Sequence, residues 1–341
     1  MDASEIKMTS KDLVTDQEVR WCPGCGDYSI LKQVQTVIPE LGLKRENIVF
    51  ISGIGCSSRF PYYMETYGMH SIHGRATAIA GGLKAVRNDL SVWIVTGDGD
   101  SLSIGGNHFI HFLRRNFDVN ILLFNNEIYG LTKGQYSPTS PEGQITKSSP
   151  YGALDHRFNP AALCLGADAS FVARTMDRDP LHLREILKRS HAHKGSSVVE
   201  IYQNCNVFND GAFETFTEKN TKKNNTIMVE HGKPLVFGET QNKGIALDGF
   251  KPVVVDLDQH SVNDLWIHDE HDMVKATLLS RMYDDHSNEY VYPRAFGVLY
   301  AQARPCYENV LNNQMNEITE KKGSGDLDKL LRGNSVWEIH A

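Results

Sequence analysis

The segment from Gly97 to Asn126 places polar residues directly after two apolar runs that are typical of buried strands. Asp98 follows Ser91–Thr96 (SVWIVT), and Asn126 follows Asn120–Phe124 (NILLF). Because neighbouring parallel strands end at the same edge of a sheet, we expect Asp98 and Asn126 to meet in the crevice above it. A carboxylate and a carboxamide suit Mg²⁺ or Ca²⁺, which bind hard oxygens and keep phosphate or water ligands. The segment therefore predicts a site for a metal-bound diphosphate.

The same segment resembles the thiamin diphosphate motif, in which GDG and a pair of asparagines stand roughly thirty residues apart. This resemblance implies that Mg²⁺ is held by Asp98, by Asn126 and by the backbone oxygen of Ile128. The alternative is a doubly wound domain that happens to carry a polar turn after a strand. GDG alone fits that alternative well, but GDG followed by the asparagine pair favours the cofactor site.

Composition narrows the class of protein. The chain has 341 residues and a net charge of −7, which argues against a nucleic-acid surface. No apolar run approaches the ~20 residues of a membrane span. The polar, acidic N-terminus lacks the features of a signal peptide, so we expect a cytoplasmic protein.

Strands and helices alternate through residue 205, which predicts an α/β fold with a mostly parallel sheet and crossover helices. We expect an N-terminal arm at residues 1–20, a thiamin-binding domain at 21–205 and a C-terminal extension at 206–341. Within the extension, Lys233–Asp258 predicts a small hairpin, and a helix is expected from about Pro293 to Glu320.

Six cysteines in a chain without an export signal point to metal or redox chemistry rather than disulfides. Cys22 and Cys25 form a CxxC, whereas Cys56 and Cys205 each follow an apolar run. Taken alone, CxxC fits a dithiol, half a zinc site or two ligands of an iron–sulfur cluster. The charged residues before it do not form the strand that normally precedes a redox dithiol. Four thiolates at one sheet edge accept either Zn²⁺ or a [4Fe–4S] cluster.

The ordered set WCPGCG, GIGCS, HGRA, GDG…NN, GLTKGQ and a late cysteine resembles the β-subunits of the 2-oxoacid:ferredoxin oxidoreductases. The resemblance covers about residues 15–210 and implies a [4Fe–4S] cluster on Cys22, Cys25, Cys56 and Cys205. It also implies contacts with thiamin diphosphate from Ile54, Gly55, Cys56, Ser57, His73, Gly99, Asp100, Gly130 and Leu131. A histidine satisfied within a turn is the alternative for His73. Other histidines match nothing in the family and are expected on the surface or on helix faces: His108, His111, His191, His193 and those of His268–Asp272.

The resemblance also implies an activity: thiamin-dependent oxidative decarboxylation of a 2-oxoacid with coenzyme A, with electrons passing through the cluster to ferredoxin. The family activates thiamin through a carboxylate on a second thiamin fold, and this chain contains one such fold. We therefore expect an α-subunit that carries the other, in a dimer of αβ heterodimers.

Two cations bear on the choice of 2-oxoacid. Arg59 stands where the family has a cation near the distal group of the substrate, and Lys133 stands at a position that is often glycine in relatives acting on uncharged 2-oxoacids. Either could pair with the second carboxylate of 2-oxoglutarate. A solvent-exposed or phosphate-contacting side chain is the alternative for each. The stretch GIGCSSRFPYYMETYGMHSIHGRA resembles the family members that act on 2-oxoglutarate, and this resemblance favours 2-oxoglutarate over pyruvate.

Two other classes of function stay open from sequence. One is a non-redox thiamin decarboxylase or synthase with zinc or free thiols at its cysteines. Such enzymes usually hold both thiamin folds in one chain and need no cysteine quartet. The other is an α/β binding subunit that has lost the chemistry, against which the intact Asp98, Asn126 and cysteines argue.

Overall fold

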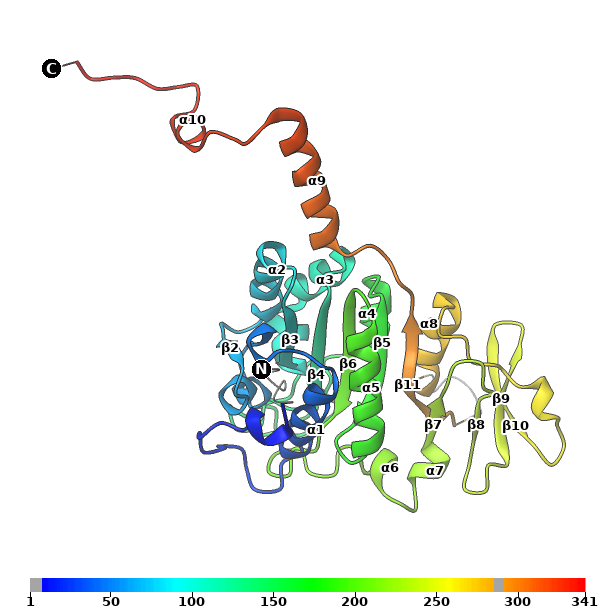
Figure 1. Cartoon of the computed structure of the whole chain (residues 1–341). Coiled ribbons are helices and arrows are strands. Elements are labelled where there is room, and N and C mark those ends of the chain that lie inside the picture. Colours follow the sequence, from blue (N-terminus) through cyan, green and yellow to red (C-terminus); the bar gives the residue numbers. More distant parts are fainter. Residues whose placement is uncertain (1–7, 285–290, 341) are drawn as a thin grey trace, which may run out of the picture.

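The computed structural model describes residues 8–284 and 291–340 (Figure 1). The strands are β1 Ile48–Ser52, β2 Tyr67–His70, β3 Ser91–Gly97, β4 Val119–Asn125, β5 Phe171–Met176, β6 Ser196–Tyr202, β7 Thr226–Val229, β8 Val236–Phe237, β9 Lys243–Asp248, β10 Lys251–Asp256 and β11 Arg294–Ala301. The α-helices are α1 Asp27–Glu40, α2 Ala76–Val86, α3 Gly106–Arg115, α4 Pro160–Gly166, α5 Pro180–Ala192, α6 Glu214–Thr217, α7 Lys222–Asn225, α8 Met273–Arg281, α9 Tyr307–Lys322 and α10 Leu327–Arg332.

An eight-stranded sheet in the order β2-β1-β3-β4-β6-β5-β11-β7 forms the centre of the molecule. The first six strands of this order pair in parallel, and β11 pairs antiparallel with β5 and parallel with β7. A separate antiparallel sheet contains β10, β9 and β8. The parallel α/β class predicted from sequence is confirmed.

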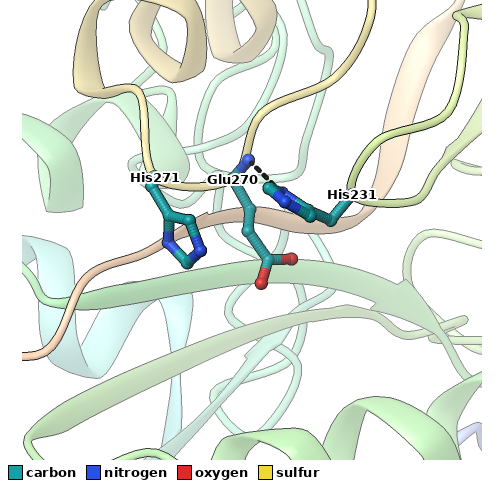
Figure 2. Close-up of side chains that lie close together, drawn as sticks. All are labelled: His231, Glu270 and His271. Atoms are coloured by element: carbon teal, nitrogen blue, oxygen red, sulfur yellow. Dashed lines mark hydrogen bonds between the residues drawn. The ribbon is translucent and has the colours of Figure 1, made fainter.

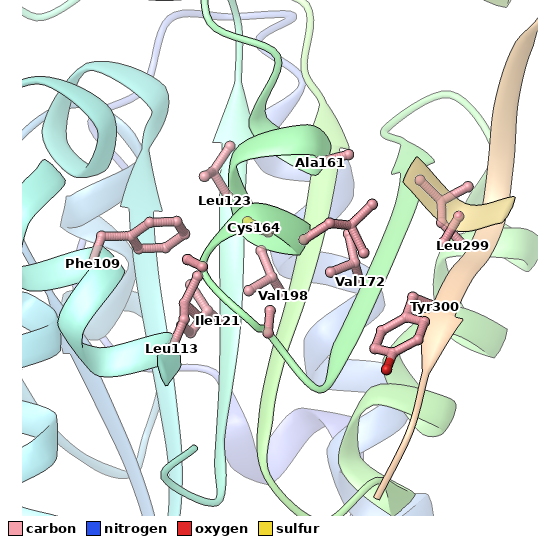
Figure 3. Close-up of a cluster of buried hydrophobic side chains, with 14 of the residues drawn as sticks. Phe109, Leu113, Ile121, Leu123, Ala161, Cys164, Val172, Val198, Leu299 and Tyr300 are labelled. Carbon is pink, nitrogen blue, oxygen red and sulfur yellow. The ribbon is translucent and has the colours of Figure 1, made fainter. Parts of the chain in front are cut away.

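Helices cover both faces of the large sheet, and successive side chains of each strand point to opposite faces. Both sets of side chains are therefore buried. Ile121 and Leu123 of β4 pack among α2, α3, α4 and α8. Leu122 and Phe124 of the same strand pack on the other face, among α1 and α5. Figure 3 shows the first of these clusters, where Phe109 of α3 and Cys164 of α4 lie over the strands. The sheet therefore forms the middle of three layers.

The region after residue 205 is joined to this sheet more closely than an extension would be. β7 and β11 are two of its strands. The prediction of a helix from Pro293 to Glu320 is wrong in its first part, because Arg294–Ala301 forms β11. The helix α9 begins only at Tyr307. The sequence RAFGVLYA is rich in the β-branched and aromatic residues that favour a buried strand. The hairpin expected at Lys233–Asp258 is present as β8 to β10.

The arm expected at residues 1–20 falls partly outside the described residues, which begin at residue 8. From there the chain packs on the body. Leu13 is fully buried, its carbonyl oxygen accepts a hydrogen bond from the Glu65 amide, and Val14 bridges to Met64. This contact holds the segment that leads into the first cysteine turn.

The C-terminal helices α9 and α10 project from the body, as Figure 1 shows in red. Only the base of α9 is held, where Tyr307 packs on Phe117 and its amide donates to the carbonyl oxygen of Asn116. Beyond it, the apolar side chains are exposed: Val310, Met315, Ile318, Leu327, Leu330, Leu331, Val336, Trp337 and Ile339. Within the described ranges, no helix is both long and apolar enough to cross a bilayer.

Candidate functional site: a polar sheet edge beside a cysteine cavity

The residues singled out from the sequence gather at one edge of the sheet, where β1, β3, β4 and β6 end. Ser52, Gly97, Asn125 and Tyr202 are the last residues of these four strands. The loops that follow contain the GIGCS, GDG and NN motifs and the late cysteine. The crevice predicted above the carboxyl ends of parallel strands is thus the place where they meet.

Asp98 is buried and surrounded by hydroxyl groups. Its Oδ2 accepts hydrogen bonds from Ser137 and, at 2.6 Å, from Thr139, both in the loop after β4. Burial raises the pKa of Asp98 above its usual value, and these hydroxyls lower it. A cation beside a buried carboxylate stabilises its charged form. Asp98 therefore fits the role of a Mg²⁺ ligand. The two hydroxyl residues were missed from sequence because they lie in an aperiodic stretch.

A chain of polar groups supports Asp98 from the centre of the sheet. Thr139 Oγ1 also lies 2.9 Å from Asn125 Oδ1, and the amide of Asn125 donates to Glu200 at 2.9 Å. Glu200 in turn accepts a 2.8 Å hydrogen bond from Arg174, with both side chains almost fully buried. Buried ion pairs are costly unless well bonded. The Arg174–Glu200 pair therefore holds the side chain of Asn125, the first asparagine of the motif, in place.

Asn126, the second asparagine, is linked directly to the cysteine turn by Gln203. The Asn126 amide donates to Gln203 Oε1 at 3.0 Å, and Gln203 Nε2 donates to Cys25 Sγ at 3.2 Å. Asn126 Oδ1 accepts a 3.2 Å bond from the amide of Ile128, which keeps these two expected metal ligands in one turn. Gln203 was not singled out from sequence. Its position just after β6 is the signal that could have found it.

Asp100, which is expected from sequence to contact the cofactor, is bonded through its side chain to other groups of this chain. Its Oδ1 accepts from the amides of Ile54 at 3.0 Å and Gly74 at 2.7 Å, and from His73 Nδ1. Its Oδ2 accepts from Thr96 at 2.8 Å. The carboxylate is thus filled by donors of this chain, and it holds the GIGCS loop and the HGRA turn together.

His73 is oriented by this contact. Because Asp100 Oδ1 can only accept, His73 carries its proton on Nδ1, which leaves Nε2 as the free acceptor. The ring is partly exposed, at 37%. The alternative raised from sequence is a histidine whose hydrogen bonds are all satisfied within a turn. Among the described residues, only Nδ1 of His73 has such a partner, Asp100.

Glycine at position 99 has a steric reason. A side chain there would collide with the ring of Tyr129, whose hydroxyl donates to the Gly99 carbonyl oxygen at 3.2 Å. Ser57, also expected near the cofactor, is buried with its hydroxyl beside Gly97. The GDG turn and the GIGCS loop therefore pack against each other closely.

All four cysteines of the expected quartet line one cavity of about 210 Å³. Other residues that line it are Arg59, Asn126, Gly130, Leu131, Lys133 and Gln203. A Cβ atom at Gly130 would lie 3.5 Å from Cys205 Sγ and 3.6 Å from Cys56 Sγ, so this glycine lies against both sulfurs. All six cysteines are free, and Cys164 and Cys306 are buried elsewhere. The structure thus brings together cysteines from three separate segments. The sequence showed the order of these segments in the chain but not their positions in space.

The spacing of the thiols bears on which metal group would fit. Four thiolates bound to one Zn²⁺ at ~2.3 Å would have their sulfurs about 3.8 Å apart. In the described part of the chain, no three cysteine sulfurs lie within 4.8 Å of one another. A [4Fe–4S] cluster binds each thiolate through a different iron atom, so its ligands stand farther apart. The four cysteines around the cavity offer the number of thiolates that a [4Fe–4S] cluster needs.

The cations that line this cavity do not offset the cost of burying free thiolates. Burial raises the pKa of Cys56 to about 12 and the pKa of Cys25 further, with Asp27 adding to both shifts. Thiols in such surroundings are poor nucleophiles, which argues against a dithiol redox centre. A bound metal group would supply the missing positive charge.

A second cavity of about 310 Å³ adjoins the first, since Arg20, Arg59 and Leu131 line both. Gly55 and His70 also line the second cavity. Arg59 Nε donates to the Tyr63 hydroxyl at 3.1 Å, which orients its guanidinium. Lys133 lines only the cysteine cavity, and its φ of 76° is a conformation that glycine adopts readily. Arg20 was missed because a lone arginine before the cysteine turn carries no pattern.

The histidines outside the motifs are not all surface groups. His268 is buried, and its Nε2 donates to the Val298 carbonyl oxygen at 2.8 Å, so the surface position expected for it is wrong. His193 also bonds internally, at 2.8 Å from the Ser170 hydroxyl. Both histidines bond to residues more than 20 positions away in the chain, which a sequence pattern does not reveal.

Comparisons with known proteins agree with this geometry. Residues 53–201 match the family described as thiamine pyrophosphate enzyme, C-terminal TPP binding domain. The chain is 51% identical over 333 residues to 2-oxoglutarate oxidoreductase subunit KorB of Mycobacterium tuberculosis, covering 96% of this chain and 88% of that relative. It is 42% identical over 205 residues to the 2-oxoacid:ferredoxin oxidoreductase subunit beta of Saccharolobus solfataricus, covering 60% of this chain and 67% of the relative.

A solved structure is also similar: 2-oxoglutarate:ferredoxin oxidoreductase from Magnetococcus marinus with 2-oxoglutarate, coenzyme A and succinyl-CoA bound. The TM-score is 0.74 at 30% sequence identity, with 96% of this chain and 97% of that chain covered. The fold, together with the motifs at the sheet edge where β1, β3, β4 and β6 end, defines a thiamin diphosphate-binding subunit of an oxidoreductase. More particularly, the chain belongs to the β-subunits of the 2-oxoacid:ferredoxin oxidoreductases.

Proposed function

We propose that this chain is the β-subunit of a 2-oxoglutarate:ferredoxin oxidoreductase. The complex would decarboxylate 2-oxoglutarate oxidatively, transfer the product to coenzyme A as succinyl-CoA and pass electrons to ferredoxin. The observation that carries the proposal is the cavity in which four cysteines lie next to Asn126, bridged by Gln203. The substrates named for the Mycobacterium tuberculosis relative and for the similar solved structure support the choice of 2-oxoglutarate.

Mg²⁺ and thiamin diphosphate would be held at the sheet edge. Asp98, Asn126 and the backbone oxygen of Ile128 are the proposed metal ligands, and the donor chemistry of the first two fits Mg²⁺. The cofactor would supply the carbon chemistry of decarboxylation. The chain itself contributes position: Asp100 holds the Ile54 amide and His73 in one arrangement, so the loop that faces the cofactor is set before it binds.

A [4Fe–4S] cluster on Cys22, Cys25, Cys56 and Cys205 would accept electrons. Gln203 has a proposed positioning role here, since its amide donates to Cys25 Sγ and accepts from Asn126. Hydrogen bonds to cluster sulfurs tune the potential of such centres. Trp21 contributes from the other side, where its indole donates to the Cys56 carbonyl oxygen at 2.7 Å.

The partner would be an α-subunit with the second thiamin fold, seated over the edge that carries the cofactor. A second contact is needed elsewhere. The helix α9 starts beside Asn116, just before β4, whereas Asn126 follows the far end of that strand. Its exposed apolar residues, and the six-residue α10 that is too short to be stable alone, favour coverage by another chain. We propose that this arm contacts a second αβ unit.

The experiment that tests the function is co-expression with the α-subunit and purification without oxygen. We expect a brown complex that reduces ferredoxin with 2-oxoglutarate and coenzyme A, with a mass equal to two αβ units. A panel of 2-oxoacids sets the substrate. Preference for pyruvate would contradict the substrate, and a colourless zinc-containing complex that releases CO₂ without reducing ferredoxin would contradict the redox role.

The variant Arg59→Leu tests the substrate cavity. A guanidinium–carboxylate pair discriminates by charge, so we expect kcat/KM for 2-oxoglutarate to fall by at least about tenfold more than for 2-oxobutyrate, which lacks the distal carboxylate. Steady-state kinetics of the complex measure this. Arg20→Leu, which alters the same cavity, is the matched comparison. Equal losses for both substrates would remove Arg59 from substrate recognition.

A further inference from the structure

A cluster of metal-ligating side chains lies outside the cofactor edge, on the C-terminal part of the chain. His231, Glu270 and His271 offer ligand atoms that all lie within 4.8 Å of one another. Figure 2 shows how these three side chains lie. His231 stands in the turn after β7, and the other two stand just before α8. We propose that these three residues form a binding site for a divalent transition-metal ion, with Zn²⁺ the best fit.

The backbone around the cluster is well held. The Gly232 amide donates to the His268 carbonyl oxygen at 2.8 Å, and the His268 amide donates to the Lys233 carbonyl oxygen at 2.9 Å. The carbonyl oxygen of Glu270 accepts from the amide of Ala301, at the end of β11, at 2.7 Å. These bonds fix the two segments against each other, so the ligands are brought together before any ion binds.

The hydrogen bonds of the imidazoles suit metal binding. His271 Nδ1 donates to the Ala301 carbonyl oxygen, which leaves Nε2 as the ring nitrogen that a metal ion can bind. Metal-binding histidines commonly have this support from a backbone carbonyl. His231 Nδ1 accepts a long 3.3 Å bond from the Glu270 amide, so that nitrogen also has a lone pair, which a metal ion could take instead.

The third proposed ligand, Glu270, is a carboxylate that is held by a hydrogen-bonding partner. Glu270 is buried at 8% exposure, and both of its carboxylate oxygens accept from Arg189 Nη2 of α5 at 2.8 Å. Each oxygen keeps a lone pair for a metal ion, and ligating carboxylates are usually hydrogen-bonded in this way. Asp269 lies 3.7 Å from His231 Nδ1 and adds a second negative charge.

Two imidazoles and one carboxylate make a ligand set that Zn²⁺ accepts, with water in a fourth position, whereas Mg²⁺ and Ca²⁺ prefer oxygen alone. The ion would join the β7–β8 turn to the segment before α8, and through Glu270 and Arg189 to α5. Since none of these residues lines either cavity of the cofactor edge, the site would stabilise the fold of the C-terminal part rather than take part in turnover.

The test uses the cluster-loaded αβ complex, stripped with a chelator and then titrated with Zn²⁺ without oxygen. We expect His271→Gln and His231→Gln each to remove one equivalent of tightly bound zinc or to weaken it at least about tenfold. His260→Gln, an exposed histidine of the same region, is the matched control and should bind zinc as wild type does. Iron content and turnover should stay unchanged in all three.

Co²⁺ in place of Zn²⁺ separates this site from the cysteines. The proposed site should show ligand-field bands without thiolate-to-cobalt charge transfer, and the bands should vanish in His271→Gln. Zn²⁺ should also raise the unfolding temperature of wild type but not of that variant, because an ion that binds only the folded state stabilises it. Equal zinc binding by wild type and both variants, or cobalt bands with thiolate character only, would overturn the proposal.

Discussion

Replacing Asp98 with alanine should abolish the binding of Mg²⁺ and thiamin diphosphate, and with it all turnover. The carboxylate is the only charged ligand that this chain is proposed to offer the metal ion, and it sits in a buried setting that raises its pKa. Loss of that charge should weaken cofactor binding by at least about a hundredfold, or about 3 kcal/mol. Isothermal titration of the cofactor-free complex with thiamin diphosphate and Mg²⁺ measures this.

The design must separate the loss of a ligand from a damaged fold, because Ser137 and Thr139 both donate to Asp98. Asp98→Asn keeps the shape and removes the charge, so it should bind the cofactor almost as poorly as the alanine variant. Glu308→Gln removes another buried carboxylate, at the base of α9, where Glu308 accepts from the Asp118 amide at 3.1 Å. This control should bind the cofactor normally. Wild-type affinity in Asp98→Ala would remove Asp98 from the metal site.

The second large effect is expected at Cys205. Cys205→Ser should lower iron and sulfide content to less than about half of wild type, because a serine oxygen is a harder, poorer ligand for a cluster than a thiolate. Electron transfer to ferredoxin should fall with it. Metal analysis and the electron paramagnetic resonance signal of the reduced complex are the measurements.

Cys205 is the informative choice among the four cysteines, since Cys56 also lies in the loop expected to touch thiamin diphosphate. Cofactor binding should therefore survive in Cys205→Ser while the cluster is lost. Cys306→Ser, a buried cysteine far from the cavity, serves as the control and should keep its iron. Full iron content in Cys205→Ser would mean that another residue completes the quartet.

Several features of the site could be predicted because their signals are local in the chain. A strand followed by GDG, and a strand followed by two asparagines, each lie within about ten residues, and the direction of parallel strands brings them to one edge. The same holds for the cysteines, whose order and spacing named the family. The C-terminal part was predicted less well: β11 was expected as helix, since a buried strand and a buried helix segment can have equally apolar sequences.

Contacts between residues far apart in sequence could not be predicted in this way. Gln203 bridges Asn126 and Cys25 only because β6 lies beside β4 in the sheet, although β5 precedes it in the chain. His231 and Glu270 meet across 39 residues, because the chain returns to the turn after β7 once it has formed β8, β9 and β10. No pattern within either segment points to the other.

What the sequence by itself determined is therefore the chemistry at hand: a parallel α/β fold, a thiamin diphosphate motif and four cysteines in family order. Tertiary structure alone decided how these groups act on one another. It made the Asp100 carboxylate the acceptor that holds Ile54 and His73, and it placed four cysteines from three segments around one cavity. The physical reason is that motifs record which side chains are present near one another in the chain, whereas strand order and packing determine which of them share a hydrogen bond or a cavity.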